Sequence, residues 1–341
     1  MHERLRSKLD RIRNDPACGE FVLADAKDSD MAWGVEAFGA RASHSGEGRP
    51  LTKPEFLADA RTVVAQGKID ILLASVSTMS VLAHQERLFE SSDVTPAVRA
   101  NDTTDIWLAR GARYHQQPSR PFRTCCLREA QHGRAGPDGE PPGPPRVNLG
   151  LYSITFNNDL RRDLEALEAY RDFRAECAET GFRHFLEVFP PNVDAGLADS
   201  DLGAYMNDMI CRTLAGVALG QRPEFLKIPY LGPAACEELT RFDPSQVVGI
   251  LGGSSGTTLD AFKLLEDAQR HGARAALFGR KIRNAEDPLL FIEHLRAIVD
   301  GRMAAGEALA SYHDALAAKG VTPLRPIDED RRLTDPVLSY K

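Results

Sequence analysis

The chain has 341 residues, 43% of them apolar, so it can bury a large core. Its formal charge is −7 at pH 7, with acidic and basic residues interspersed, which argues against a nucleic-acid-binding surface. No apolar run approaches the ~20 residues needed to cross a bilayer, and the first residues lack the apolar segment of a secretory signal, so we expect a cytoplasmic protein without a membrane partner.

Residues 1–20 have the pattern of an amphipathic helix. After them, short β-rich apolar runs alternate with amphipathic helical stretches, which is typical of a parallel sheet with crossover helices. This pattern predicts an α/β fold, a (β/α)8 or TIM barrel over residues 21–300, whose N-terminal mouth the first helix plugs. The eight strand candidates are residues 21–25, 69–75, 96–100, 147–154, 184–189, 224–228, 247–251 and 274–278. The clearest helices are residues 54–66, 160–179, 202–219, 258–271 and 288–300.

Three further segments exceed a minimal barrel. Residues 28–53 form a long glycine-bearing loop at the presumed catalytic face, where we expect a lid. Residues 111–145 contain a proline- and glycine-dense stretch that prevents regular structure and predicts an exposed insertion. Residues 301–341 predict a C-terminal helix, at 302–320, and a polar tail that wraps a neighbouring subunit.

The cysteines show no metal-ligand spacing, which suits reduced thiols. Cys125 and Cys126 are adjacent, and we expect two packed thiols there. The alternative is an unusual redox pair. The six are Cys18, Cys125, Cys126, Cys177, Cys211 and Cys236.

Lys227 stands inside an apolar strand, at residues 225–230. An amine attacks a carbonyl only when it is neutral, and desolvation at the end of an apolar strand favours the neutral form. The alternative is a lysine whose stem packs while its ammonium group reaches water. Because this strand directly precedes the phosphate-like turns described next, we favour imine chemistry at Lys227.

Glycine-marked turns follow the last two predicted strands, at residues 252–256 and at Gly279-Arg280. In (β/α)8 barrels the loops after strands seven and eight commonly bind phosphate through backbone amides. Each turn alone is equally explained by a tight connection between strand and helix. Two turns at consecutive strand ends, with Arg280 after the second, favour a phosphate site.

Residues 227–232, 252–255 and 279–288, taken in order, resemble the class I, Schiff-base aldolases of the archaeal-type fructose-bisphosphate aldolase group. Deoxyribose-phosphate and tagatose-bisphosphate aldolases are more distant relatives of that group. The resemblance implies that Lys227 forms the imine, that the enzyme needs no cofactor, and that it assembles as a homo-oligomer. It also implies that phosphate is bound at the turns, by Gly252, Gly253, Ser254, Gly279 and Arg280.

Two acid–base positions follow from the same resemblance. Asp25 ends the first strand, where the family has a functional aspartate, although Asp28 or Asp30 can do the same work. The family's proton-transferring tyrosine precedes a proline on strand five, but this chain has Phe189 there. Because alternate strand residues share a face, Glu187 is the predicted substitute, either as a proton shuttle or as an ion-pair partner that tunes the lysine.

The sequence therefore predicts a class I aldolase that cleaves or forms a sugar-phosphate aldol. Tyr152 and Tyr230 are weaker proton-transfer candidates, because tyrosine in barrel walls is usually packing. Alternatives are a non-catalytic or repurposed barrel that binds a phosphorylated sugar, and a metal-independent isomerase. A metal-dependent enzyme is disfavoured, since among the histidines only His184 lies in a predicted strand.

Overall fold

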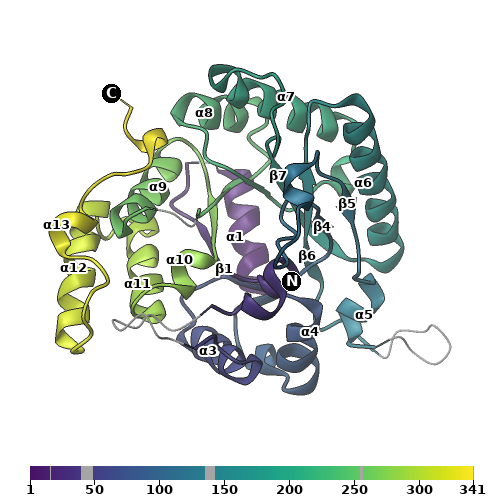
Figure 1. Ribbon diagram of the computed structural model, residues 1–341. Coiled ribbons are helices and arrows are strands. Elements are labelled where there is room, and N and C mark those ends of the chain that lie inside the picture. Colours follow the sequence, from purple (N-terminus) through teal and green to yellow (C-terminus); the bar gives the residue numbers. More distant parts are fainter. Residues whose placement is uncertain (16, 40–48, 135–142, 254–255, 341) are drawn as a thin grey trace.

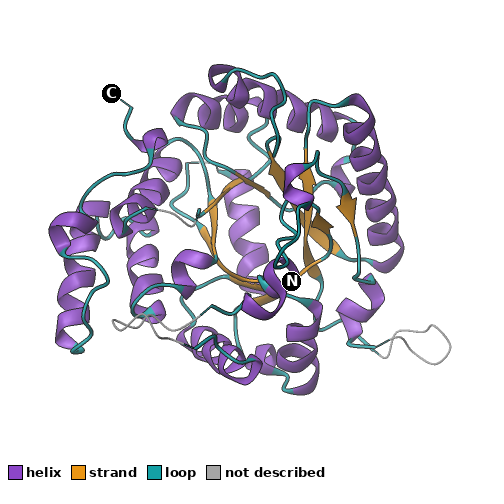
Figure 2. Ribbon diagram, in the orientation of Figure 1, coloured by secondary structure: helices purple, strands orange, loops and turns teal. Residues whose placement is uncertain are grey.

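The computed structural model describes all residues except 16, 40–48, 135–142, 254–255 and 341. Its strands form a closed parallel barrel in the order β1-β10-β9-β8-β7-β6-β3-β2, surrounded by helices (Figures 1 and 2). The predicted (β/α)8 barrel is thus confirmed, and each predicted strand lies within two residues of its observed bounds. The barrel strands are β1 (Val22–Lys27), β2 (Ile71–Ala74), β3 (Thr95–Arg99), β6 (Leu149–Thr155), β7 (Arg183–Phe189), β8 (Leu226–Ile228), β9 (Val248–Leu251) and β10 (Ala275–Phe278).

Local signals fix where the outer helices begin and end. Asp159 caps the longest of them by accepting a hydrogen bond from the backbone amide of Arg162, and Gly181 ends it in the left-handed conformation with φ 67°. Helix α7 stops at Ala215, earlier than predicted, where Gly216 follows as the C-cap. The main helices are α3 (Lys53–Gln66), α6 (Leu160–Thr180), α7 (Leu202–Ala215), α8 (Pro233–Phe242), α9 (Thr258–Arg270), α11 (Pro288–Val299) and α12 (Ala305–Ala318).

Side chains inside the barrel alternate along each strand with side chains that face the helices. In β1, Val22 and Ala24 belong to the interior apolar cluster, whereas Leu23 belongs to the cluster between strands and helices. The interior cluster continues through residues such as Leu151 and Phe185 on β6 and β7. This alternation decides which polar residues near the strand ends can reach the inside of the barrel.

Helix α1 (Glu3–Asn14) closes the N-terminal end of the barrel. Leu5, Leu9 and Ile12 project from one side of the helix and join the interior cluster. Lys8 donates from the same helix to the carbonyl of Phe21, just before β1 begins. In Figure 1 this helix lies within the ring of strands.

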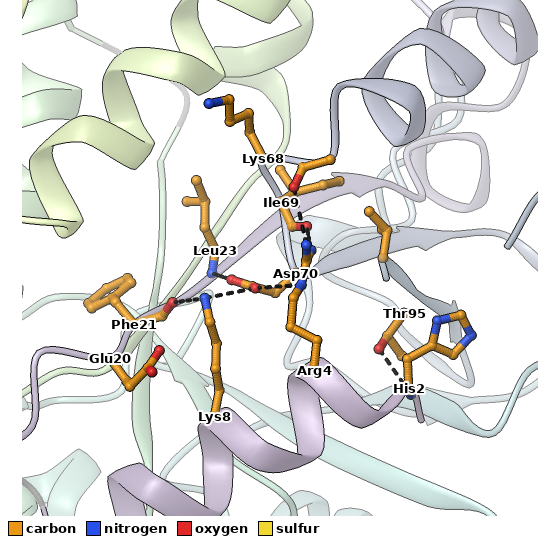
Figure 3. A network of polar contacts seen from close by, with 12 residues as sticks. His2, Arg4, Lys8, Glu20, Phe21, Leu23, Lys68, Ile69, Asp70 and Thr95 are labelled. Atoms are coloured by element: carbon orange, nitrogen blue, oxygen red, sulfur yellow. Dashed lines mark hydrogen bonds and ion pairs between the residues drawn. The ribbon is translucent and has the colours of Figure 1, made fainter. Parts of the chain in front are cut away.

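Asp70, which directly precedes β2, is the centre of a charge cluster at this closed end (Figure 3). Its carboxylate lies 2.9 Å from Lys8 Nζ, 3.4 Å from Arg4 Nε and 2.6 Å from Arg296 Nη2, and it accepts a hydrogen bond from the Leu23 amide. Burial alone would raise the pKa of Asp70, but Arg296, Lys8 and the amide together hold it below its ordinary value. We call Asp70 with its three cations the N-terminal cluster.

The segment at 111–145 is more regular than predicted. Strand β5 (Pro121–Phe122) pairs antiparallel with β4 (Asp102–Thr103), and α5 (Leu127–His132) follows. Leu127 and Ala130, three residues apart on one side of α5, are buried in the outer core, so this part is not an exposed insertion. Much of the proline- and glycine-dense stretch, 135–142, lies outside the described residues.

The described part of the C-terminal tail packs on its own chain, and contact with a neighbouring subunit stays a prediction. Helix α13 (Ile327–Asp330) ends at Asp330, whose Oδ1 accepts a 2.7 Å hydrogen bond from the amide of Thr258. Thr334 Oγ1 donates to Asp260 Oδ2 at 2.5 Å. The tail therefore completes the N-terminal end of α9, where free backbone amides need acceptors.

Other predictions concern the loop at 28–53 and the cysteines. The described part of the loop contains α2 (Asp30–Trp33), but residues 40–48 of the predicted lid lie outside the described residues. All six cysteines are free, so adjacent Cys125 and Cys126 are not bonded to each other. In the described chain, no helix is both long and apolar enough to cross a membrane.

Candidate active site

A cavity of about 890 Å³, including its open mouth, lies at the C-terminal ends of the barrel strands. This is the end of the barrel at which enzymes of this fold carry their active sites. Most of the predicted site residues line it, namely Lys227, Glu187, Gly252, Gly253, Gly279 and Arg280, together with Phe189. Ser254 lies outside the described residues.

Lys227 and Glu187 form a buried ion pair in this cavity. They occupy neighbouring positions on adjacent strands β8 and β7, so their side chains enter the barrel side by side. Lys227 Nζ lies 2.5 Å from Glu187 Oε1, and the side chains are 9% and 2% exposed. The pair thus places an amine and a proton acceptor in contact, with little water around them.

The second carboxylate oxygen of Glu187 is fixed by two other side chains. Ser153 Oγ on β6 donates to Oε2 at 2.6 Å, and Arg99 on β3 approaches the same oxygen at 3.3 Å and 3.4 Å. Burial alone would raise the pKa of Glu187, but Lys227 and Arg99 hold it below its ordinary value. Glu187 is therefore an oriented carboxylate whose Oε1 faces the amine.

Arg99 links three carboxylates at the base of the cavity. Besides Glu187, its guanidinium contacts Asp28 Oδ2 at 3.0 Å and Asp102 Oδ1 at 2.9 Å. Burial works to lower the pKa of Arg99, but the three carboxylates raise it above its ordinary value. Sequence reasoning missed Arg99, although a charged residue at the end of a buried strand is the same signal that identified Lys227.

The glycines near strands β9 and β10 have a packing role. A Cβ at Gly252 would collide with the ring of Phe278, and one at Gly279 would lie 2.8 Å from the backbone oxygen of Ala26. Gly253 has φ +59°, which favours glycine. Close packing and backbone conformation therefore account for glycine at these three positions. All three residues line the cavity.

Arg280 brings positive charge to the same side of the cavity. Its guanidinium lies over the ring of Trp33, 5.2 Å from the centroid, and both residues line the cavity. Arg283, one turn later, also lines it and donates to Ser29 Oγ at 3.2 Å. Within the described part of the chain neither arginine has a carboxylate partner.

Asp25 is not among the residues that line the cavity, and its acid–base role stays a prediction. Val22 and Ala24 face the interior, so alternation turns Asp25 toward the helices, where Lys27 Nζ lies 3.1 Å from its Oδ2. Burial raises the pKa of Asp25, and the charge of Lys27 opposes the rise. Asp28, which the prediction left open as an alternative to Asp25, lines the cavity.

The two weaker tyrosine candidates lie outside the cavity. Tyr152 is buried against Phe173, with ring centroids 4.3 Å apart. Tyr230 donates a 2.5 Å hydrogen bond to Asp267. Both tyrosines therefore support the outer core. Across the described ranges, no group of three or more His, Cys, Asp and Glu side chains forms a candidate metal site.

Fold and site together define a (β/α)8 barrel with a buried lysine–carboxylate pair at the mouth where such barrels react. No protein-family model and no curated protein matches this sequence. Among solved structures, an archaeal fructose 1,6-bisphosphate aldolase is similar with a TM-score of 0.58 and 14% identity, over 86% of this chain and 99% of that one.

Two further solved structures are similar over most of the chain. One is an archaeal fructose-1,6-bisphosphate aldolase with its catalytic lysine covalently bound to the carbinolamine intermediate (TM-score 0.59, 16% identity, 86% of this chain, 100% of that one). The other is a Corynebacterium glutamicum protein (TM-score 0.56, 16% identity, 89% of this chain, 99% of that one). The resemblance to archaeal-type aldolases is thereby confirmed at the level of the fold.

Proposed function

We propose that this protein is a class I aldolase that cleaves or forms a phosphorylated sugar-like aldol through a Schiff base on Lys227. The observation that carries this proposal is the 2.5 Å contact between Lys227 Nζ and Glu187 Oε1 inside the cavity. An imine-forming lysine needs a nearby group that accepts its proton, and Glu187 is held ready for that task by Ser153 and Arg99.

The first stage forms the imine. When a substrate carbonyl displaces water from the cavity, Glu187 takes a proton from the Lys227 ammonium group. The neutral amine adds to the carbonyl carbon, and a proton passes from nitrogen to oxygen to give a carbinolamine. Glu187 returns its proton to the hydroxyl group, water leaves, and a protonated imine remains on Lys227.

The second stage cleaves the carbon–carbon bond. Glu187, again ionised, accepts the proton of the hydroxyl group on the departing carbon. The electrons of the carbon–carbon bond move to the imine nitrogen, so an aldehyde leaves and an enamine stays on Lys227. Glu187 then protonates the enamine carbon, and water hydrolyses the imine to release the second product. Condensation runs through the same steps in reverse.

Phe189 is the reason why we assign proton transfer to Glu187. It lines the cavity but has no exchangeable proton, and the tyrosines considered as replacements lie elsewhere. The same residue favours a second candidate function, a barrel that binds a phosphorylated sugar without turnover.

Reductive trapping tests the proposal. The protein is incubated with dihydroxyacetone phosphate, reduced with borohydride, digested and mapped by mass spectrometry. We expect an adduct on Lys227. Lys27 is the matched internal control, because it is the other lysine that lines the cavity, and it should stay unmodified. An adduct on Lys27 alone, or none from a broad panel of ketose phosphates, would favour the binding protein instead.

A further inference from the structure

The charges that line the cavity are distributed unevenly. Five cationic residues line it, and three of them are paired with carboxylates. The paired cations are Lys227 with Glu187, Arg99 with Asp28 and Asp102, and Lys27 with Asp25. Only Arg280 and Arg283 have no carboxylate partner among the described residues.

These two arginines form a single positive region. Both belong to α10 (Arg280–Arg283), the short helix after β10. Burial and the charge of Arg280 both lower the pKa of Arg283, as expected for two like charges that line the same cavity. An anion between them relieves the repulsion of like charges, and the planar guanidinium group suits phosphate oxygens.

The part of the cavity around Lys227 and Arg99 has the opposite character. There Glu187 and Asp28 line the cavity and pair with these two cations, and Asp102, outside the lining, also contacts Arg99, so this part carries no excess of positive charge. The neighbouring lining is apolar, and it is formed by Ile106 and Phe189. Among the described residues, no unpaired cation lies here.

We propose that the substrate carries one phosphate, bound at Arg280 and Arg283, and that the portion beyond Lys227 is uncharged. A second phosphate would face Asp28 and its neighbouring carboxylates, and like charges at close range disfavour binding. Bisphosphorylated sugars are thus rejected. The assignment of this molecule as a substrate rests on the proposed aldolase function, whereas the charge selectivity does not depend on turnover.

Calorimetric binding of hexitol phosphates tests the selectivity. Hexitol 1-phosphate and hexitol 1,6-bisphosphate lack a carbonyl group, so neither can form an imine with Lys227. We expect the monophosphate to bind at least about tenfold more tightly than the bisphosphate, a ratio that corresponds to one well-placed charge interaction. Equal or tighter binding of the bisphosphate, or binding of neither compound, would overturn the inference.

Two variants test where the phosphate and the uncharged end of the ligand bind. Arg280→Gln should weaken binding of the monophosphate about tenfold. Arg171→Gln is the control, because Arg171 is exposed and pairs only with neighbouring Asp172 among the described residues. Asp28→Asn should narrow the difference between the two hexitol phosphates. An unchanged affinity in Arg280→Gln, or an unchanged ratio in Asp28→Asn, would contradict the assigned orientation.

The outcomes separate this inference from the proposed function. If the monophosphate is preferred but nothing is trapped on Lys227, the site selects monophosphates without imine chemistry and the aldolase proposal fails. If Lys227 is trapped but the bisphosphate binds better, the aldolase proposal stands and the monophosphate inference fails.

Discussion

Asp70 and Glu187 are buried carboxylates at opposite ends of the barrel, and both are surrounded by cations. Asp70 is enclosed by Lys8, Arg4 and Arg296, and α1 covers that end of the barrel. Glu187 also has cationic neighbours, but its partner Lys227 lines an open cavity. The same kind of ion pair is thus fully covered at one end of the barrel, where we expect it to serve stability, and open to the cavity at the other, where the proposed function gives it a role in reactivity.

Among the variants considered, loss of the Lys227 amine should have the largest effect on activity. We expect Lys227→Ala to lower kcat/KM by at least about 10³-fold, because the other lysine in the lining, Lys27, is paired with Asp25 and should not form the imine in its place. The fold should survive, since Ser153 and Arg99 still hold Glu187. Steady-state kinetics and thermal unfolding measure the two effects, and substantial residual turnover would remove the imine from the mechanism.

Glu187→Gln keeps the shape of the side chain but removes the proton acceptor. We expect kcat to fall about 10²-fold with a smaller change in KM, as for the loss of a general acid–base group. Glu224→Gln is the matched control, since Glu224 is a buried carboxylate paired with Arg13 and Arg183 near the N-terminal end of β8. Equal losses of kcat in both variants would point to a structural role for Glu187.

Asp70→Asn should lower stability and leave activity nearly unchanged. Removal of one partner from a buried charge cluster typically costs about 3 kcal/mol of unfolding free energy, and kcat should stay within about twofold of wild type. Urea denaturation and kinetics measure both quantities. Asp10→Asn, at an exposed pair with Arg13, should change stability by less than about 0.5 kcal/mol. A large loss of kcat in Asp70→Asn would mean that the two ends of the barrel are coupled.

Lowering the pH should produce a smaller effect, which is a change in the stability that Asp70 contributes. Because the folded-state pKa of Asp70 is lowered, its contribution is complete above the unfolded-state pKa and is lost as pH falls through the folded-state value. The stability difference between wild type and Asp70→Asn should be constant from about pH 5 to 7 and shrink by about 1 kcal/mol per unit below about pH 4. Urea titrations at pH 3, 4, 5 and 7 measure it, and a constant difference throughout would dismiss the ionised form as the stabilising one.

The sequence was sufficient to predict the barrel and the closeness of Lys227 and Glu187, because both depend on local periodicity. Apolar runs of strand length recur along the chain, and the spacing of Glu187 from Phe189 places both on one face. The sequence could not show that Asp25 stays out of the cavity lining, because its orientation depends on which alternate residues of β1 face inward, and only the closed barrel decides that. Arg99 and Ser153 were missed because their contacts join strands far apart in the chain.

The position of α1 also has a consequence for synthesis of the chain. Leu5 and Leu9 are made before the barrel strands, yet the apolar cluster that receives them includes Val247 and Ala275, which are made more than two hundred residues later. Arg13 likewise cannot form its ion pair until Glu224 has been made. Contacts of such long range form late, because loop closure must precede them. Helix α1 therefore has no complete docking surface until the last barrel strand has been added.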